Sequence, residues 1–86
     1  MDDLEKLRQK INDIDDKLLQ LLSKRIKVCK SVGAAKKKKG LPIRDASREN
    51  EVYNRIKQKS SELGLNSDQV QTVYREIVNM CSAVQE

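Results

Sequence analysis

Apolar side chains recur at alternating spacings of three and four residues in the first part of the chain, a pattern typical of one face of a long α-helix. The stripe consists of Leu4, Leu7, Ile11, Ile14, Leu18, Leu21, Val28, Val32 and Ala35. Asp2 and Glu5 form a capping-box-like start, and Gly40 and Pro42 provide stop signals. The pattern predicts one helix over about residues 3–38, roughly 54 Å long.

Two shorter helices are predicted after a loop. Asp45 caps the second helix and Gly64 ends it. Asn66 caps a third helix, whose apolar stripe continues to the end of the sequence. No strand pattern or repeat interrupts this order. The sequence therefore predicts an all-α fold with one long and two shorter helices, in a single domain over residues 1–86.

The first predicted helix is too long for one small domain to cover. A compact chain of this length has a radius of gyration of about 12 Å, and a helix of roughly 54 Å overshoots it. The apolar stripe needs a partner beyond that globule, and a second copy of the chain is the simplest one. We therefore expect an intertwined helical homodimer.

Composition restricts the chemistry that the chain can perform. Of its 86 residues, 36% are charged, the net charge is +5, and His, Phe and Trp are absent. Any catalysis must therefore use Lys, Arg, carboxylates and amides, because no imidazole is present as a general base. The positive charge favours anionic partners, namely nucleic acid, a phospholipid surface or a small polyanion.

The two cysteines, Cys29 and Cys81, have neither a CxxC motif nor the spacing of a metal site. A disulfide between them is an open alternative that nothing else in the sequence supports. No apolar run approaches the ~18 residues of a membrane span, and the N-terminal segment is acidic and amphipathic, unlike a signal peptide. We expect a reduced, cytoplasmic protein with no metal, no cofactor and no membrane partner.

One charge interrupts the apolar stripe of the long helix. Arg25 occupies a heptad position that holds aliphatic residues elsewhere, and an unpaired buried guanidinium is costly. It either reaches solvent or a buried carboxylate, or it points at an anionic ligand inside the bundle. Lys36 points within about 20° of the same direction, so one anion would contact both cations. Lys36 also opens a run of four lysines, which is otherwise typical of a solvated face.

Other charged and polar residues have two interpretations. Arg8 lies roughly 25 Å from Arg25 along the helix axis, so it is either an ordinary surface residue or part of a partner's site in a crossed dimer. The cluster Asp45, Arg48 and Glu49 is explained by capping and a local ion pair as well as by binding. Cys81 and Gln85 share one face of the third helix, which suits packing as well as a site.

Taken in order, these segments resemble the type II, all-helical chorismate mutases over nearly the whole chain. The matching stretches are LRQKINDID at 7–15, LLSKR at 21–25, VGAAK at 32–36 and LPIRDASRE at 41–49. The resemblance implies the rearrangement of chorismate to prephenate, a [3,3] Claisen-type step of phenylalanine and tyrosine biosynthesis that uses no cofactor. Fixed cations and amide donors would hold the dianionic substrate and stabilise its transition state.

The same resemblance implies roles for individual residues. Arg25 binds one substrate carboxylate, and Arg8 of the other subunit binds the second. Lys36 contacts a carboxylate and the ether oxygen, and Gln85 donates to the ether oxygen. Cys81 stands where relatives often carry a carboxylate-binding Ser, and its thiol is a weaker donor.

On the other side of the site, the resemblance implies that Glu49 and the backbone of Asp45 hold the substrate hydroxyl, while Arg48 organises this wall. Two alternative functions stay open. An isochorismate-pyruvate lyase shares the fold and a similar basic site, although Glu49 favours the mutase. A basic helical dimer that binds nucleic acid is less favoured, because no aromatic side chains lie among the basic residues for stacking.

Overall fold

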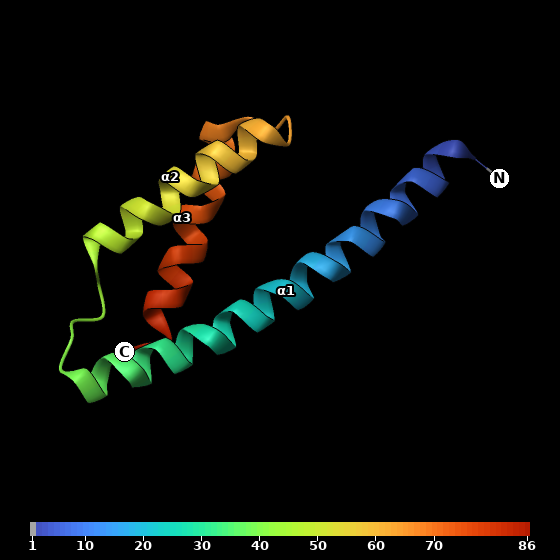
Figure 1. The fold of residues 1–86 in the computed structure, drawn as a ribbon. Helices are drawn as coiled ribbons and strands as arrows, with labels where there is room; N and C mark the ends of the chain where they lie inside the picture. Colours follow the sequence, from blue (N-terminus) through green and yellow to red (C-terminus); the bar gives the residue numbers. More distant parts are fainter. Residues whose placement is uncertain (1) are drawn as a thin grey trace.

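A computed structural model describes residues 2–86 of the chain (Figure 1). It contains the helices α1 (Asp3–Lys39), α2 (Ala46–Glu62) and α3 (Ser67–Ala83), and this part of the chain has no strand. The predicted all-α fold with one long and two shorter helices is therefore confirmed.

Side-chain caps and glycines set the helix boundaries. Carboxylate or amide oxygens of Asp2, Asp45 and Asn66 each accept a hydrogen bond from a backbone N–H two or three residues later. Gly40 ends α1 with φ 67°, and Gly64 follows α2 with φ 73°. Both glycines adopt the left-handed conformation that other residues disfavour. The boundaries therefore follow from local sequence.

The three helices form an elongated molecule. α2 and α3 pack on each other, α3 meets α1 near the C-terminal end of each helix, and the N-terminal half of α1 extends away from both (Figure 1). The chain measures 58 × 24 × 15 Å and has a radius of gyration of 16.3 Å. A compact chain of this size would have about 12 Å, so α1 does overshoot the rest of the molecule.

The extended half of α1 presents an uncovered apolar face. Its stripe consists of Leu4, Leu7, Ile11, Ile14, Leu18 and Leu21, whose exposed fractions lie between 49% and 61%. By contrast, the core within the described residues is small, with Cys29 and Val78 as its buried apolar side chains. A continuous apolar face of this length is typical of an interaction surface.

Cys29 of α1 and Cys81 of α3 form a disulfide, with their Cα atoms 5.3 Å apart. This separation lies within the usual range for disulfides. The expectation of a reduced protein, made from the sequence, is wrong for this structure. The sequence left this bond open because 52 residues separate the two cysteines, and only the packing of α3 on α1 brings them together.

The described residues contain neither a membrane-spanning helix nor a metal-binding cluster. Across residues 2–86, no helix combines the length and apolarity that crossing a membrane requires. The same residues contain no group of three or more His, Cys, Asp and Glu side chains that could hold a metal ion.

Candidate active site

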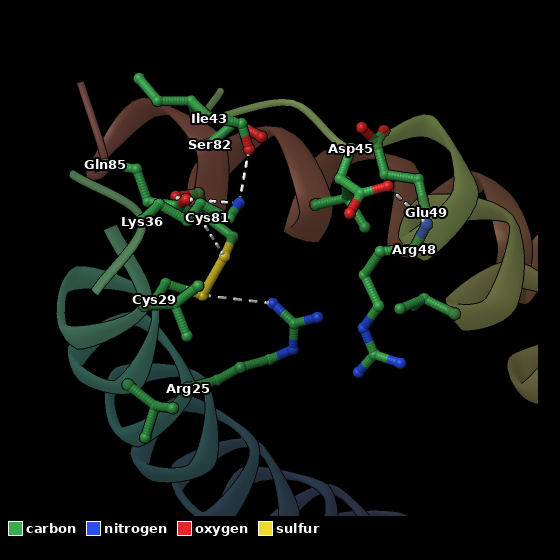
Figure 2. A pocket seen from close by; sticks show the side chains of 14 residues that line it. Arg25, Cys29, Lys36, Ile43, Asp45, Arg48, Glu49, Cys81, Ser82 and Gln85 are labelled. Carbon is green, nitrogen blue, oxygen red and sulfur yellow. Dashed lines mark hydrogen bonds between the residues drawn. A yellow bond between two sulfur atoms is a disulfide. The ribbon is translucent and has the colours of Figure 1, made fainter. Parts of the chain in front are cut away.

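A pocket of about 310 Å³ lies where the three helices and the loop between α1 and α2 come together (Figure 2). Its volume suits a small molecule. It is lined by Arg25, Val28, Cys29, Val32, Lys36, Ile43, Asp45, Arg48, Glu49, Val52, Val78, Cys81, Ser82 and Gln85. Charged and amide groups thus surround an otherwise aliphatic cavity.

The structure brings together seven of the eight site residues that the sequence predicts. They are Arg25, Lys36, Asp45, Arg48, Glu49, Cys81 and Gln85. The eighth, Arg8, is exposed on the extended half of α1 and does not line the pocket. A contribution of Arg8 to this pocket would therefore have to come from another chain.

Helix α1 supplies two cations to the pocket, Arg25 and Lys36. Both side chains are half-buried, and neither forms an ion pair with a carboxylate of residues 2–86. Nη1 of Arg25 lies 3.7 Å from Sγ of Cys29, a weak acceptor. Within this part of the chain, the alternative of a carboxylate paired with Arg25 is thus excluded. Two half-buried cations without anionic partners form a favourable site for an anion.

Lys36 and Gln85 are in direct contact at one end of the pocket. Nζ of Lys36 donates to Oε1 of Gln85 at 2.8 Å and to the carbonyl oxygen of Ile43. Nε2 of Gln85 donates to the carbonyl oxygen and to Sγ of Cys81, at 3.1 and 3.2 Å (Figure 2). These acceptors are uncharged, so the ammonium charge stays available to a ligand that enters the pocket.

Gly33 allows this contact by letting α3 approach α1 closely. A Cβ atom at Gly33 would lie 2.8 Å from Cγ of Gln85 and 3.0 Å from its Cα atom. Such distances are too short, so a larger residue would displace the turn that carries Gln85. The sequence contained a signal for this role, because a glycine inside a helix costs about 1 kcal/mol relative to alanine and suggests a packing requirement.

The start of α2 forms the opposite wall. Oδ1 of Asp45 accepts a hydrogen bond from the backbone N–H of Arg48 at 3.0 Å, which makes Asp45 the N-cap. The guanidinium of Arg48 donates to Glu51 at 3.2 Å, and both side chains are about two-thirds exposed. An exposed ion pair of this kind contributes little to stability, so Arg48 can leave Glu51 and turn toward a ligand at a small cost in free energy.

Glu49 is held in place by Arg44, a residue that the sequence analysis missed. Nη1 of Arg44 donates to Oε1 of Glu49 at 2.9 Å, while Nη2 donates to Oδ1 of Asn79 on α3 at 2.8 Å. Arg44 thereby links the loop, α2 and α3 around the Glu49 carboxylate. No local sequence signal identifies this role, because Asn79 lies 35 residues from Arg44.

A search of protein families finds that the model of chorismate mutase type II matches residues 7–86. The chain belongs to the type II chorismate mutase family. The family resemblance expected from the sequence is therefore confirmed.

Relatives of this chorismate mutase family member include proteins of different lengths. The bifunctional chorismate mutase/prephenate dehydratase of Aquifex aeolicus is 33% identical over 89 residues, which cover 100% of this chain and 25% of that protein. A chorismate mutase of Methanocaldococcus jannaschii is 41% identical over 54 residues, which cover 63% of this chain and 54% of that protein. This chain thus spans about a quarter and about half of the two proteins' lengths.

A solved structure supports the fold assignment. A conserved hypothetical protein from Pyrococcus furiosus superposes with a TM-score of 0.75 and 29% sequence identity. The match covers 96% of this chain and 95% of that one. The chorismate mutase fold of this chain, including its long first helix, is thus similar to that of a solved protein of nearly the same size.

Seven lining residues of this chorismate mutase family member were not predicted as part of the site, and two of these, Cys29 and Ser82, carry a sulfur or oxygen atom in the side chain. Cys29 lines the pocket as the disulfide partner of Cys81. Ser82 is buried at 9% exposure and also lines it, although it points about 100° away from Cys81 on an ideal helix. The pocket is wide enough to include consecutive side chains of α3, which helical periodicity alone does not indicate.

Proposed function

We propose that this chain is a chorismate mutase that rearranges chorismate to prephenate. The observation that carries the proposal is the pair Arg25 and Lys36, which face one pocket without a carboxylate partner in residues 2–86. Two cations suit a substrate with two carboxylates, and membership in the chorismate mutase family supports the choice of substrate. Gln85, in contact with Lys36, adds an uncharged donor.

The proposed reaction requires positioning and electrostatics rather than acid–base chemistry. The ether C–O bond of chorismate breaks while a C–C bond forms within the same molecule, and no proton is transferred. The pocket must hold the chair-like conformer and stabilise negative charge that develops on the ether oxygen. We assign Arg25 to a carboxylate, Lys36 to a carboxylate and the ether oxygen, and Gln85 to the ether oxygen. To reach it, the Gln85 amide must turn one N–H away from Cys81.

The remaining proposed roles belong to Cys81 and to the wall of the pocket that the start of α2 forms, the α2 wall. We assign Glu49 and the backbone of Asp45 to the substrate hydroxyl, and Arg48 to the organisation of this wall. The link from Arg44 to Glu49 supports the first assignment, because a positioned carboxylate accepts a hydrogen bond at a defined place. Cys81 has no S–H group in the disulfide form, so it would donate to a carboxylate only when reduced.

We further propose that the active form is a homodimer in which Arg8 completes the partner's pocket. The uncovered apolar stripe of α1 supports this proposal, because it offers a long face for the same helix of a second copy. Arg8 lies on that extended half, outside its own pocket. A third cation from the partner would supply the contact for the second carboxylate.

The proposal also covers the setting of the enzyme. We place residues 1–86 in one chorismate mutase domain that acts in phenylalanine and tyrosine biosynthesis, in the cytoplasm, without a nucleic-acid or membrane partner. The family match over residues 7–86 supports this assignment.

The test is to incubate purified protein with chorismate and to identify the product by chromatography. The expected result is loss of the ultraviolet absorbance of chorismate and appearance of prephenate, without added metal or cofactor. Release of pyruvate from isochorismate in place of this reaction would identify the lyase. If neither substrate is consumed and the protein binds RNA with a steep salt dependence, the enzymatic proposal is wrong.

A further inference from the structure

The Cys29–Cys81 disulfide lies in the wall of the pocket, where α3 meets α1. Both cysteines line the cavity; Cys29 is 5% exposed and Cys81 is half-buried. The bond joins the helices where their C-terminal parts approach each other, while α2 lies against α3 and away from α1 (Figure 1). A covalent link at this place holds together two elements that share a limited contact.

The same cysteine anchors Gln85. The Gln85 amide donates to the carbonyl oxygen and Sγ of Cys81 and accepts from Lys36 at 2.8 Å. α3 ends at Ala83, so Gln85 lies just past the last helical residue, and helix ends fray. Fixing Cys81 to α1 one turn earlier therefore restrains the position of Gln85 relative to Lys36.

We propose that Cys29 and Cys81 form a redox-dependent latch that positions Gln85 for catalysis. The proposal rests on the mutase function proposed above. In the disulfide form, the last turn of α3 is fixed on α1 and Gln85 stays beside Lys36. In the dithiol form, the last turn of α3 separates from α1 more often. Cys29 and Cys81 are thus positioning residues for the Gln85 amide.

A small-molecule disulfide is the oxidant for this latch. One cysteine thiolate attacks it to form a mixed disulfide, and the second cysteine displaces the small thiol. One S–S bond breaks and one forms, and the two electrons and two protons lost by the cysteines end on two small thiols. Cys81 faces the pocket, so the reagent can reach it there and Cys81 attacks first; Cys29, whose Sγ lies 3.7 Å from Nη1 of Arg25, then displaces the small thiol.

The latch should act on turnover more than on binding. A donor to the ether oxygen acts mainly in the transition state, so a loosened Gln85 lowers kcat while KM changes little. The bond also closes a loop between residues 52 positions apart, which restricts the unfolded chain. Oxidation should therefore raise both the turnover number and the melting temperature.

The experiment compares the full chain after reduction with dithiothreitol and after oxidation with excess oxidised glutathione. Mass spectrometry should show that the oxidised chain loses the mass of two hydrogen atoms and carries an intrachain bond. We expect its Tm to be about 10 °C higher, and hydrogen exchange over residues 81–86 to be slower. With chorismate, kcat should be roughly 3- to 10-fold higher. KM should change little, because the Cys81 thiol that oxidation removes is only a weak donor to the substrate.

The matched control is Cys29→Ala, which removes the bond and keeps Cys81. After dithiothreitol, its Tm, exchange and kcat should match those of the reduced wild type. After oxidised glutathione it can form only a mixed disulfide at Cys81, which mass spectrometry distinguishes from the intrachain bond and which should neither raise Tm nor slow the exchange over residues 81–86. Cys29→Ser repeats the test if the alanine variant is unstable. Three results would overturn the latch. The thiols could stay reduced in excess oxidant, the bond could form between two chains, or hydrogen exchange over residues 81–86 could be equal in the reduced and oxidised states. Absence of turnover in both states, with the difference in exchange intact, would instead refute the mutase function and leave the latch standing.

Discussion

At the scale of single residues, the site is defined by charges placed where helix packing alone would put aliphatic groups. Arg25 stands in the apolar stripe of α1, and Lys36 follows it about three turns later on the same face. The structure shows both at one pocket, without carboxylate partners in residues 2–86. A half-buried cation without a partner lowers stability, so a binding role accounts for a feature that folding alone does not require.

Arg25→Ala should therefore reduce kcat/KM by about 100-fold or more, because a charged donor to the substrate is lost. Helix content measured by circular dichroism and the oligomeric state measured by light scattering should be unchanged. Arg55→Ala is the control, since Arg55 is an exposed arginine of α2 that does not line the pocket. An Arg25→Ala variant that keeps full activity would show that this arginine has only a structural role.

At the scale of secondary-structure elements, the approach of α3 to α1 builds the end of the pocket that holds Lys36 and Gln85. Gly33 permits the approach, the Cys29–Cys81 bond fixes it, and the pair Lys36 and Gln85 results from it. The α2 wall depends instead on the loop, where Asp45 caps the helix. The two walls of the pocket thus depend on different residues, so a substitution can disturb one wall and leave the other intact.

Gly33→Ala tests whether turnover depends on the close approach of α3 to α1. Helix propensity alone predicts a gain of about 1 kcal/mol in stability, but the added Cβ would lie 2.8 Å from Cγ of Gln85 and push the end of α3 away. We expect helix content to be retained while kcat falls about 10-fold or more, with a smaller change in KM. Ser31→Ala, an exposed position on the same helix, should leave both parameters unchanged. Wild-type kinetics for Gly33→Ala would show that turnover does not depend on this close approach.

At the scale of the whole molecule, one chain leaves half of its longest helix uncovered. The exposed stripe from Leu4 to Leu21 extends beyond the small core, and Arg8 lies on the same half. Both observations support a dimer whose two sites each take residues from both chains. Stability should then depend on protein concentration, as it does for proteins that fold with their partners.

Mixing inactive Arg8→Ala and Arg25→Ala chains should restore activity if the site is shared. In a mixed dimer, one pocket has both arginines and the other has neither, so random exchange should give about a quarter of wild-type turnover. Turnover of chorismate is measured after native mass spectrometry has verified chain exchange. The matched control mixes Arg25→Ala chains with chains that carry both substitutions, which should stay inactive. No recovery in the first mixture would refute the intersubunit role of Arg8.

Much of the fold was predictable because its determinants are local. The caps at Asp2, Asp45 and Asn66 and the left-handed glycines act within a few residues of the helix ends that they set. The alignment of Arg25 with Lys36 follows from helical periodicity alone. The length of α1 and the order of the family-like segments are likewise visible in the sequence, so it indicated both the overshoot of α1 and the likeness to a known family.

The contacts that complete the pocket were not predictable in this way, because they join residues far apart in the chain. Cys29 and Cys81 are 52 residues apart, Lys36 and Gln85 are 49 apart, and Arg44 reaches Asn79 over 35. Helical periodicity gives the direction of a side chain from its own axis, but not how closely two axes approach. The sequence by itself thus determined the helices and the faces that carry charge. Only the tertiary structure decided which faces meet, because that depends on packing at Gly33 and on the bond between α1 and α3.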